Sequence, residues 1–400
     1  MRTRRGACYS CHDELAEGPE MHLPKRRRTA ATEEGSPSAV SGPAGSAAAG
    51  DMFDELPDDL VVSILADVAA SAASPADLAG AIMTCKRFRE LAQSKVVLTK
   101  ASPRCLAVRA KTWSDAAHQF LQRCADAGNL DASYLLGMIR FYCLGSRGSG
   151  AALMAAAAVG GHRDALYSLA VIQFNGSGGS KDDRDLRAGA ALCARAASLG
   201  HVDALRELGH CLQDGYGVRR SLLDGRRLLI QANARELAAA SASLAKPSAS
   251  SRAGRQHSCL LSDFGCRAAA AAAAGEAHAA NRFLSDWFAS RPLAGADTGA
   301  GGTGTGPAPM ELEDGGSGGG GLRLCSHAQC GRPETRRHEF RRCSVCGVVN
   351  YCSRACQALH WKMAHKAECT PMDRWLDAAN ANPIPDPNAD AAVAVAAPAL

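Results

Sequence analysis

The first apolar pattern along the chain begins at Leu56 and recurs every three or four residues, which is the spacing of one helix face. Pro57 has a fixed φ, and the acidic pair behind it suits the positive end of a helix dipole, so a helix should start there. Ser74-Pro75 offers a second helix start, and a third apolar element ends near Leu91. The pattern predicts three short helices over 53–100. The stripe of the first helix consists of Leu56, Leu60, Val61, Ile64, Leu65 and Val68.

A second pattern, G-[NH]-x-D-A-x₃-L-[GA], occurs three times, starting at Gly128, Gly161 and Gly200, so that the copies are 33 and 39 residues apart. Such periods are typical of stacked helix pairs, because one pair cannot bury its own apolar face. The first Gly of each copy would end the preceding helix in a left-handed turn, and the Ala would allow close helix packing. We therefore predict a mainly α protein with a solenoid of helix pairs over 115–290. Turns inside the pairs are expected at Gly176, Gly178, Gly179, Gly215 and Gly217, and a degenerate capping copy at Gly275–Trp287.

Three segments lack any apolar period and are rich in Gly, Ala, Ser, Thr or Pro, namely 1–50, 292–321 and 377–400. We expect a disordered N-terminus, a flexible linker and a disordered tail. Lys25-Arg26-Arg27-Arg28 in the first segment is a basic cluster of the nuclear-import type, or else a solvated run of charge. Cys8 to His12 spells a haem-attachment motif, which we interpret as coincidence.

Composition narrows the classes of function. Aromatic residues make up only 5% of the 400 residues and glycine numbers 40, which favours small helical cores over one large sheet. A net charge of +5 is weak for this length and gives no strong reason to expect nucleic acid or a membrane as partner. The chain shows no apolar run of transmembrane length and no apolar region behind Arg2, so we expect neither a membrane span nor a secretory signal. The expected location is the nucleus, the cytoplasm or both.

Seven of the 17 cysteines lie between Cys325 and Cys369, together with His365. Close pairs of such residues on tight turns are typical of zinc sites, and eight ligands make two full tetrahedral sets. A disulfide cluster is the alternative, which an intracellular location disfavours. Full ligand sets leave no open position for water, so the two Zn²⁺ ions should be structural and supply the folding free energy of this stretch. Much of its basicity offsets thiolate charge, which makes nucleic-acid binding less plausible. The expected ligands are Cys325, Cys330, Cys343, Cys346, Cys352, Cys356, His365 and Cys369.

Residues 53–100 resemble an F-box, on the opening Leu56-Pro57, the helical stripe and the run Cys85-Lys86-Arg87-Phe88. The resemblance implies docking on the Skp-type adaptor of a cullin–RING ubiquitin ligase. The repeats resemble the Sel-like class of tetratricopeptide relatives, which are protein-binding scaffolds. By the same resemblance, the residues that contact the adaptor would be Leu56, Pro57, Leu60 and Ile64.

Residues 325–369 resemble a MYND-type zinc finger, on the run Tyr351-Cys352-Ser353, then Cys356-Gln357, Trp361, His365-Lys366 and Cys369. The resemblance implies interleaved ligand pairs, with Cys325, Cys330, Cys352 and Cys356 on one ion and Cys343, Cys346, His365 and Cys369 on the other. It also implies a shallow groove for proline-containing peptides at Gln357 and Trp361, although Trp361 could equally serve core packing. Four residues between the first two cysteines, where two are usual, depart from the family pattern. His327 and His360 are left over, and we interpret His360 as a surface residue.

Together these features favour a non-catalytic adaptor that recruits target proteins to an SCF-type ubiquitin ligase. The alternative is a nuclear scaffold or transcriptional co-regulator that binds proline-containing peptides through the finger and has no link to a ligase. An enzyme is the least favoured class, because the sequence offers no catalytic domain, no phosphate-binding Gly loop and no plausible triad.

Overall fold

The computed structural model describes residues 55–244, 260–261, 265–273, 277–291, 293 and 321–371. The chain divides into two compact units, Met1–Pro57 and Asp58–Leu400. The basic cluster Lys25–Arg28, nearly all of the expected linker and the expected tail lie outside the described residues, as does Cys8–His12. Within them, no helix has the length and apolar character needed to cross a membrane.

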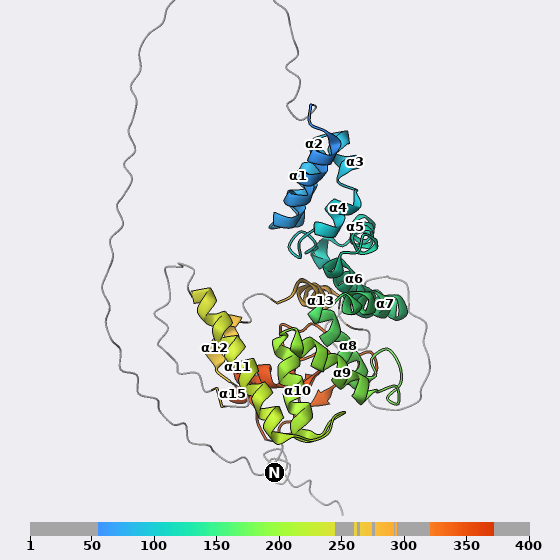
Figure 1. Ribbon diagram of the computed structural model, residues 1–400. Helices are drawn as coiled ribbons and strands as arrows, with labels where there is room; N and C mark the ends of the chain where they lie inside the picture. The colour runs from blue at the N-terminus through green and yellow to red at the C-terminus, as the bar shows by residue number, and fades with distance from the viewer. Residues whose placement is uncertain are drawn as a thin grey trace, which may run out of the picture. The chain divides into compact units, whose positions relative to one another are not determined.

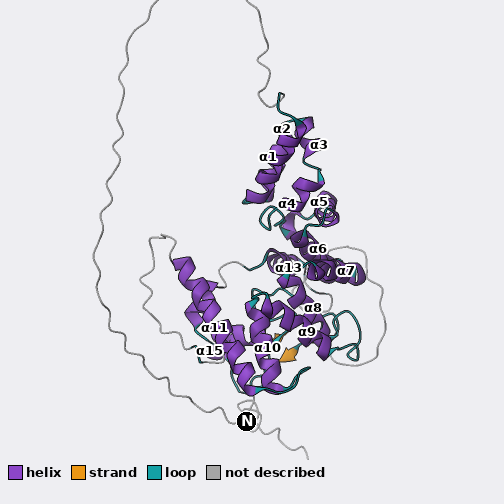
Figure 2. Cartoon of the chain, viewed as in Figure 1, coloured by secondary structure: helices purple, strands orange, loops and turns teal. Residues whose placement is uncertain are grey.

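Most of the described residues of the second unit are helical, and the strands that are described belong to the C-terminal finger (Figure 2). The helices before the finger are α1 (Asp58–Ser71), α2 (Pro75–Thr84), α3 (Lys86–Leu91), α4 (Lys95–Lys100), the short η1 (Ala110–Thr112), α5 (Asp115–Asp126), α6 (Leu130–Tyr142), α7 (Arg147–Val159), α8 (Arg163–Asn175), α9 (Leu186–Ser198), α10 (Val202–Asp214), α11 (Leu222–Leu244), α12 (Arg267–Ala273) and α13 (Ala279–Ser290) (Figure 1). The finger contributes β1 (Arg341–Arg342), β2 (Asn350–Tyr351), α14 (Arg354–His360), the π-helical turn η2 (Trp361–His365) and α15 (Lys366–Glu368).

Helices α1 to α3 form where the apolar and capping signals predict them. The Asp77 carboxylate accepts from the Ser74 N–H at 3.1 Å and so fixes the start of α2. Arg87 pairs with Asp58 at 2.7 Å and ties α3 to the start of α1. The residues of the predicted apolar stripe of α1 differ in their exposure. Val61 and Leu65 are buried, whereas Leu60 and Ile64 remain 47% and 42% exposed.

Helices α6–α7, α8–α9 and α10–α11 are the three predicted pairs, and each pair packs against the next. Gly128, Gly161 and Gly200 have φ between 89° and 96°, as a left-handed helix end requires. The predicted solenoid is therefore confirmed, with one copy of the motif opening the first helix of each pair.

The structure explains why the motif has a histidine and an aspartate. His162 Nδ1 caps α8 by accepting from Ala165 N–H at 3.1 Å, and its Nε2 donates to Asp131 of the preceding copy at 3.2 Å. His201 caps α10 in the same way and meets Asp164 at 3.3 Å. Each histidine thus joins two successive copies.

The first copy has asparagine in place of histidine because its neighbour is not another repeat. Asn129 still caps α6, accepting from Ala132 N–H at 3.0 Å. Its amide group also donates to the backbone carbonyls of Leu98 and Ala101, at 3.1 and 2.8 Å. The buried Asn129 therefore joins the repeats to the end of α4. A neutral histidine that caps through Nδ1 has one ring N–H left and could not donate to both carbonyls.

The expected capping copy at Gly275–Trp287 does not extend the stack. Its helix, α13, packs against α6 and η1 at the first repeat, where Phe283 meets Trp113 edge to face at 5.3 Å. The helix that packs against α11 is instead α12. The local motif was visible in the sequence, but the direction in which the chain returns was not.

Close packing within the first pair gives a test of the solenoid. A Cβ added at Gly150 would lie 2.6 Å from the Phe141 nitrogen and 2.7 Å from the Gly137 oxygen, both backbone atoms. Gly150→Ala should therefore lower the free energy of unfolding by about 1–3 kcal/mol, because α6 and α7 must separate. Urea unfolding followed by circular dichroism measures it. Gly148→Ala in the same helix meets no atom within 4 Å and should change stability by less than about 1 kcal/mol. Equal effects of the two changes would contradict the packing.

Candidate functional site

A hairpin turn and a helix start place four of the finger's cysteines. Strands β1 and β2 pair antiparallel, with Arg341 opposite Tyr351, and the hairpin turn carries Cys343 and Cys346. The Gly347 N–H donates to the Cys343 carbonyl at 2.9 Å, which closes that turn. Ser353 caps α14 by accepting from Cys356 N–H at 3.1 Å, so Cys356 lies in the first turn of the helix, one turn beyond Cys352.

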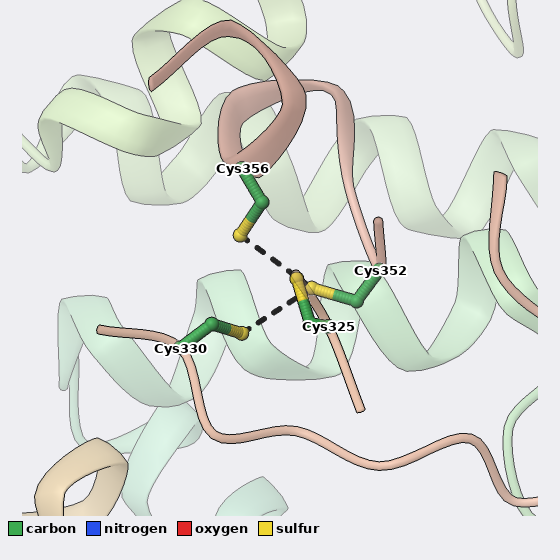
Figure 3. A group of neighbouring side chains, drawn as sticks. All are labelled: Cys325, Cys330, Cys352 and Cys356. Atoms are coloured by element: carbon green, nitrogen blue, oxygen red, sulfur yellow. Dashed lines mark hydrogen bonds between the residues drawn. The ribbon is translucent and has the colours of Figure 1, made fainter. Parts of the chain in front are cut away.

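The structure gathers the eight expected ligands into two groups, each with its ligand atoms within 4.8 Å of one another. The first consists of Cys325, Cys330, Cys352 and Cys356, whose thiol groups converge (Figure 3). The second consists of Cys343, Cys346, His365 and Cys369. These are the interleaved sets that the resemblance implied, and the four-residue spacing from Cys325 to Cys330 does not prevent them.

The distances suit tetrahedral zinc. In the first group, Cys330 Sγ and Cys356 Sγ lie 3.5 and 3.6 Å from Cys352 Sγ. In the second, Cys343 Sγ lies 3.9 Å from Cys369 Sγ. A tetrahedral Zn²⁺ with Zn–S bonds of about 2.3 Å needs sulfur atoms about 3.8 Å apart. All seven finger cysteines are free thiols, so two Zn²⁺ ions fit the finger.

Arg332 balances the negative charge of the first group. Its guanidinium is buried, 3.5 Å from Cys330 Sγ and 2.8 Å from the Ser168 hydroxyl of α8. Burial disfavours this charge, but the thiolates of Cys330 and Cys352 outweigh burial and raise the pKa of Arg332. Four thiolates around one Zn²⁺ carry a net charge of about −2, which one buried arginine halves.

A third group with metal-binding side chains, Asp131, His162 and His278, has a different role. The Nδ1 atoms of both histidines accept from backbone N–H groups at 3.1 Å, those of Ala165 and Ala280. A neutral imidazole that accepts at Nδ1 carries its proton on Nε2, which then has no lone pair for a metal. Burial also lowers the pKa of His278, which favours this neutral form. The group caps helices and joins repeats.

The finger lies against the first helices of the second and third repeats. Tyr167 and Asn175 of α8 donate to the Ser353 hydroxyl and the Cys352 carbonyl, at 3.2 and 2.8 Å. Glu207 of α10 accepts from Ala355 N–H at 2.9 Å. Burial raises the pKa of Glu207, and the hydrogen bond from Ala355 and the charges of Arg341 and Arg354 oppose that shift. We call the repeat residues Tyr167, Ser168, Asn175 and Glu207 the inner face; the finger covers it.

The two residues expected to bind peptide, Gln357 and Trp361, line one groove of about 320 Å³. One wall comes from the finger, and His210 and Asp214 of α10 form the other. Trp361 is half-buried and also lines a second hollow on its far side. It is therefore available at a surface, and the groove belongs jointly to finger and repeats.

The expectation that His360 is a surface residue is wrong. His360 is half-buried, its Nδ1 lies 3.0 Å from the Tyr351 hydroxyl, and its ring stacks on His365 at 5.5 Å. His360 thus packs against His365, a ligand of the second metal group. His327 is buried and lines a cavity of about 290 Å³ between finger and repeats. Neither histidine belongs to a metal group.

The four expected adaptor-contact residues are all at least partly accessible. Leu60 and Ile64 are exposed on α1, and in the first unit Pro57 is exposed and Leu56 half-exposed. Within α1 the exposed pair alternates with buried Val61 and Leu65, so the helix has an apolar face beyond what its own core uses.

Comparison with known proteins agrees with this architecture. A family described as plant tetratrico peptide repeats matches residues 105–199, and the MYND finger family matches residues 325–369. F-box protein At1g67340 of Arabidopsis thaliana is 55% identical over 365 residues, which cover 88% of each chain. The chain belongs to the F-box protein family. A second Arabidopsis relative, F-box protein At5g50450, is 55% identical over 82% of this F-box protein and 88% of its own length.

Among solved structures, a Sel1 repeat protein from Oxalobacter formigenes is similar at 24% identity and a TM-score of 0.27, over 29% of this F-box protein and 88% of that chain. The family matches and the two Arabidopsis relatives confirm the F-box, tetratricopeptide-type repeat and finger resemblances drawn from the sequence, at the level of family. The sequence reasoning missed the inner face. Its signal was polar residues such as Asn175 and Glu207 inside otherwise apolar repeat helices.

Proposed function

We propose that this F-box protein is a substrate-recruiting adaptor of a cullin–RING ubiquitin ligase. The observation that carries the proposal is the exposed apolar pair Leu60 and Ile64 on α1, in a chain that matches F-box proteins over 88% of its length. Contiguous exposed apolar residues beside a complete core are typical of protein–protein contacts. The proposed partner of this surface, together with Leu56 and Pro57, is a Skp-type adaptor and, through it, a cullin.

The target side of the proposal is the groove with Gln357 and Trp361. It is open to solvent, it has an aromatic wall, and both zinc ions that fit nearby would have four protein ligands. Such ions hold structure and leave no position for a reacting water. The protein would act by proximity, holding a target segment while other subunits carry out ubiquitin transfer.

The test is capture of a Skp-type adaptor by the full-length protein and by a Leu60→Asp, Ile64→Asp variant. Losing two apolar anchors should weaken capture by at least about 30-fold, since each is worth about 1–2 kcal/mol or more. Leu223→Asp is the matched control, because Leu223 is an exposed leucine of α11 and should leave capture unchanged. Equal capture by all three forms would contradict the proposed ligase role and favour the alternative, a scaffold that has no link to a ligase.

A further inference from the structure

The wall of the groove defined by Gln357 and Trp361 contains two arginines, of which one has an ion-pair partner within 4 Å among the described residues. Arg354 in its wall pairs with Asp214. Arg341, also in the wall, lies 5.0 Å over the Tyr216 ring, and no carboxylate of the described residues lies within 4 Å of it. Val345 beside it is 40% exposed. Burial raises the pKa of Glu207 and the charge of Arg341 opposes that shift, but the Arg341 guanidinium has no close carboxylate among the described residues. An apolar and aromatic groove with such a guanidinium suits a segment that has apolar residues and a carboxylate.

The hollow on the other side of Trp361 has the same character. It measures about 500 Å³ and includes Arg267 and Lys366, both exposed, together with Met363. Trp361 lines both hollows and so lies where an extended segment would pass from one to the other. The basic residues of the two hollows therefore favour an acidic occupant over a basic one.

The sequence beyond the finger contains an acidic segment with prolines. The described residues end at Pro371, two positions after Cys369, and Cys369 Sγ lies 3.9 Å from Cys343, which lines the groove. The sequence then continues to Pro383-Ile384-Pro385-Asp386-Pro387. Over 372–400 it has four aspartates and one arginine, so its charge is opposite to that of the groove.

We infer that the segment Pro383–Pro387 binds in the groove of its own chain, with its apolar residues against Trp361 and Asp386 against Arg341. The tail would then be a built-in competitor for the target segment. This inference rests on the proposed use of the groove for targets. Proline-rich segments lose little entropy on binding, and aromatic grooves are their usual receptors.

The length of the spacer and the effective concentration of the tethered segment both permit binding within one chain. A random coil of the length between Pro371 and Pro383 spans about 20 Å on average, and this stretch starts two residues beyond Cys369 of the second metal group. Such a tether gives an effective concentration on the order of 1 mM. A segment with an intrinsic Kd of about 100 μM would thus fill its own groove about nine-tenths of the time and weaken a competing peptide about tenfold.

The test is fluorescence anisotropy with a labelled peptide of residues 380–391, added to the zinc-loaded full-length protein. A full-length tail variant, Pro383→Ala, Ile384→Ala, Pro385→Ala and Asp386→Ala, should bind the peptide about tenfold more tightly than wild type. Pro398→Ala, a proline of the same tail outside the segment, should bind like wild type. Arg341→Glu added to the tail variant should weaken binding at least tenfold, which places the peptide in this groove.

Several results of this experiment would overturn the inference. No binding to the tail variant, equal binding to variant and wild type, or no effect of Arg341→Glu would each overturn the inference. A mass by light scattering that doubles in wild type and not in the tail variant would also overturn it, in favour of binding between two copies. Adaptor capture, which depends on Leu60 and Ile64, is a separate measurement: its failure overturns the proposed ligase role and leaves the anisotropy result standing.

Discussion

Replacing Cys352 by serine is expected to lower the zinc content from two ions per chain to one and to destabilise the repeats together with the finger. A structural zinc site contributes about 10 kcal/mol or more of apparent binding free energy, which is comparable with the whole stability of a domain. The finger also satisfies buried polar groups of the inner face, including Asn175, which donates to the Cys352 carbonyl. Leaving such groups unpaired costs about 1–3 kcal/mol each.

The expected result is therefore a fall in Tm of about 10 °C or more for the helical signal, which comes mainly from the repeats. Elemental analysis and thermal unfolding by circular dichroism measure the two effects on the same sample. Cys143→Ala is the control, because Cys143 is a half-buried cysteine at the end of α6 and outside both metal groups. An unchanged Tm in a Cys352→Ser protein with one zinc would show that finger and repeats are energetically independent.

Glu236→Ala is expected to be the most destabilising change that leaves the zinc ligands intact. Glu236 of α11 accepts from Arg206 of α10 and from Lys362 of the finger, the latter at 2.8 Å, and all three side chains are almost wholly buried. Burial, and then the charge of Arg206, lower the pKa of Lys362. Glu236→Ala removes the carboxylate that pairs with two buried cations, Arg206 and Lys362. It should therefore lower the free energy of unfolding by about 3–5 kcal/mol.

Chemical unfolding at neutral pH measures this loss of stability, and two further variants test its cause. Asp224→Ala breaks a surface pair with Arg227, whose side chain is 78% exposed, and should cost no more than about 1 kcal/mol. Replacing all three buried groups, by Arg206→Met, Glu236→Leu and Lys362→Met, should recover most of the stability because no unpaired charge remains. If Glu236→Ala costs no more than Asp224→Ala, the buried network does not hold the finger to the repeats.

Local features of this fold could be predicted because short-range chemistry determines them. The start of α2 depends on Ser74 and Asp77, and the repeat boundaries depend on glycines such as Gly161 with positive φ. The zinc ligands belong to the same class, because spacing and residue type alone mark them. The interleaving of the two sets needed the family resemblance, since spacing fits several pairings equally well.

Long-range features could not be predicted because they depend on where the chain returns. The sequence motif before α13 matched a capping copy, yet the helix packs on the first repeat. His360 faces Tyr351 because α14 packs on the hairpin, which its own sequence does not reveal. Glu207 and Asn175 are polar residues in apolar helices, but their partners lie in the finger, 148 and 177 residues later in the chain, so the sequence does not reveal them.

The return of α13 to the first repeat, together with the finger's contacts to the second and third, fixes the length of the array. In an open solenoid, a copy can be gained or lost at one end without disturbing the others. Here an inserted copy would shift Tyr167 and Glu207 relative to Ser353 and Ala355, and would separate α13 from α6. We therefore expect homologues of this protein to vary in their loops and tails and to keep three helix pairs. They should diverge by substitution and not by duplication of a repeat.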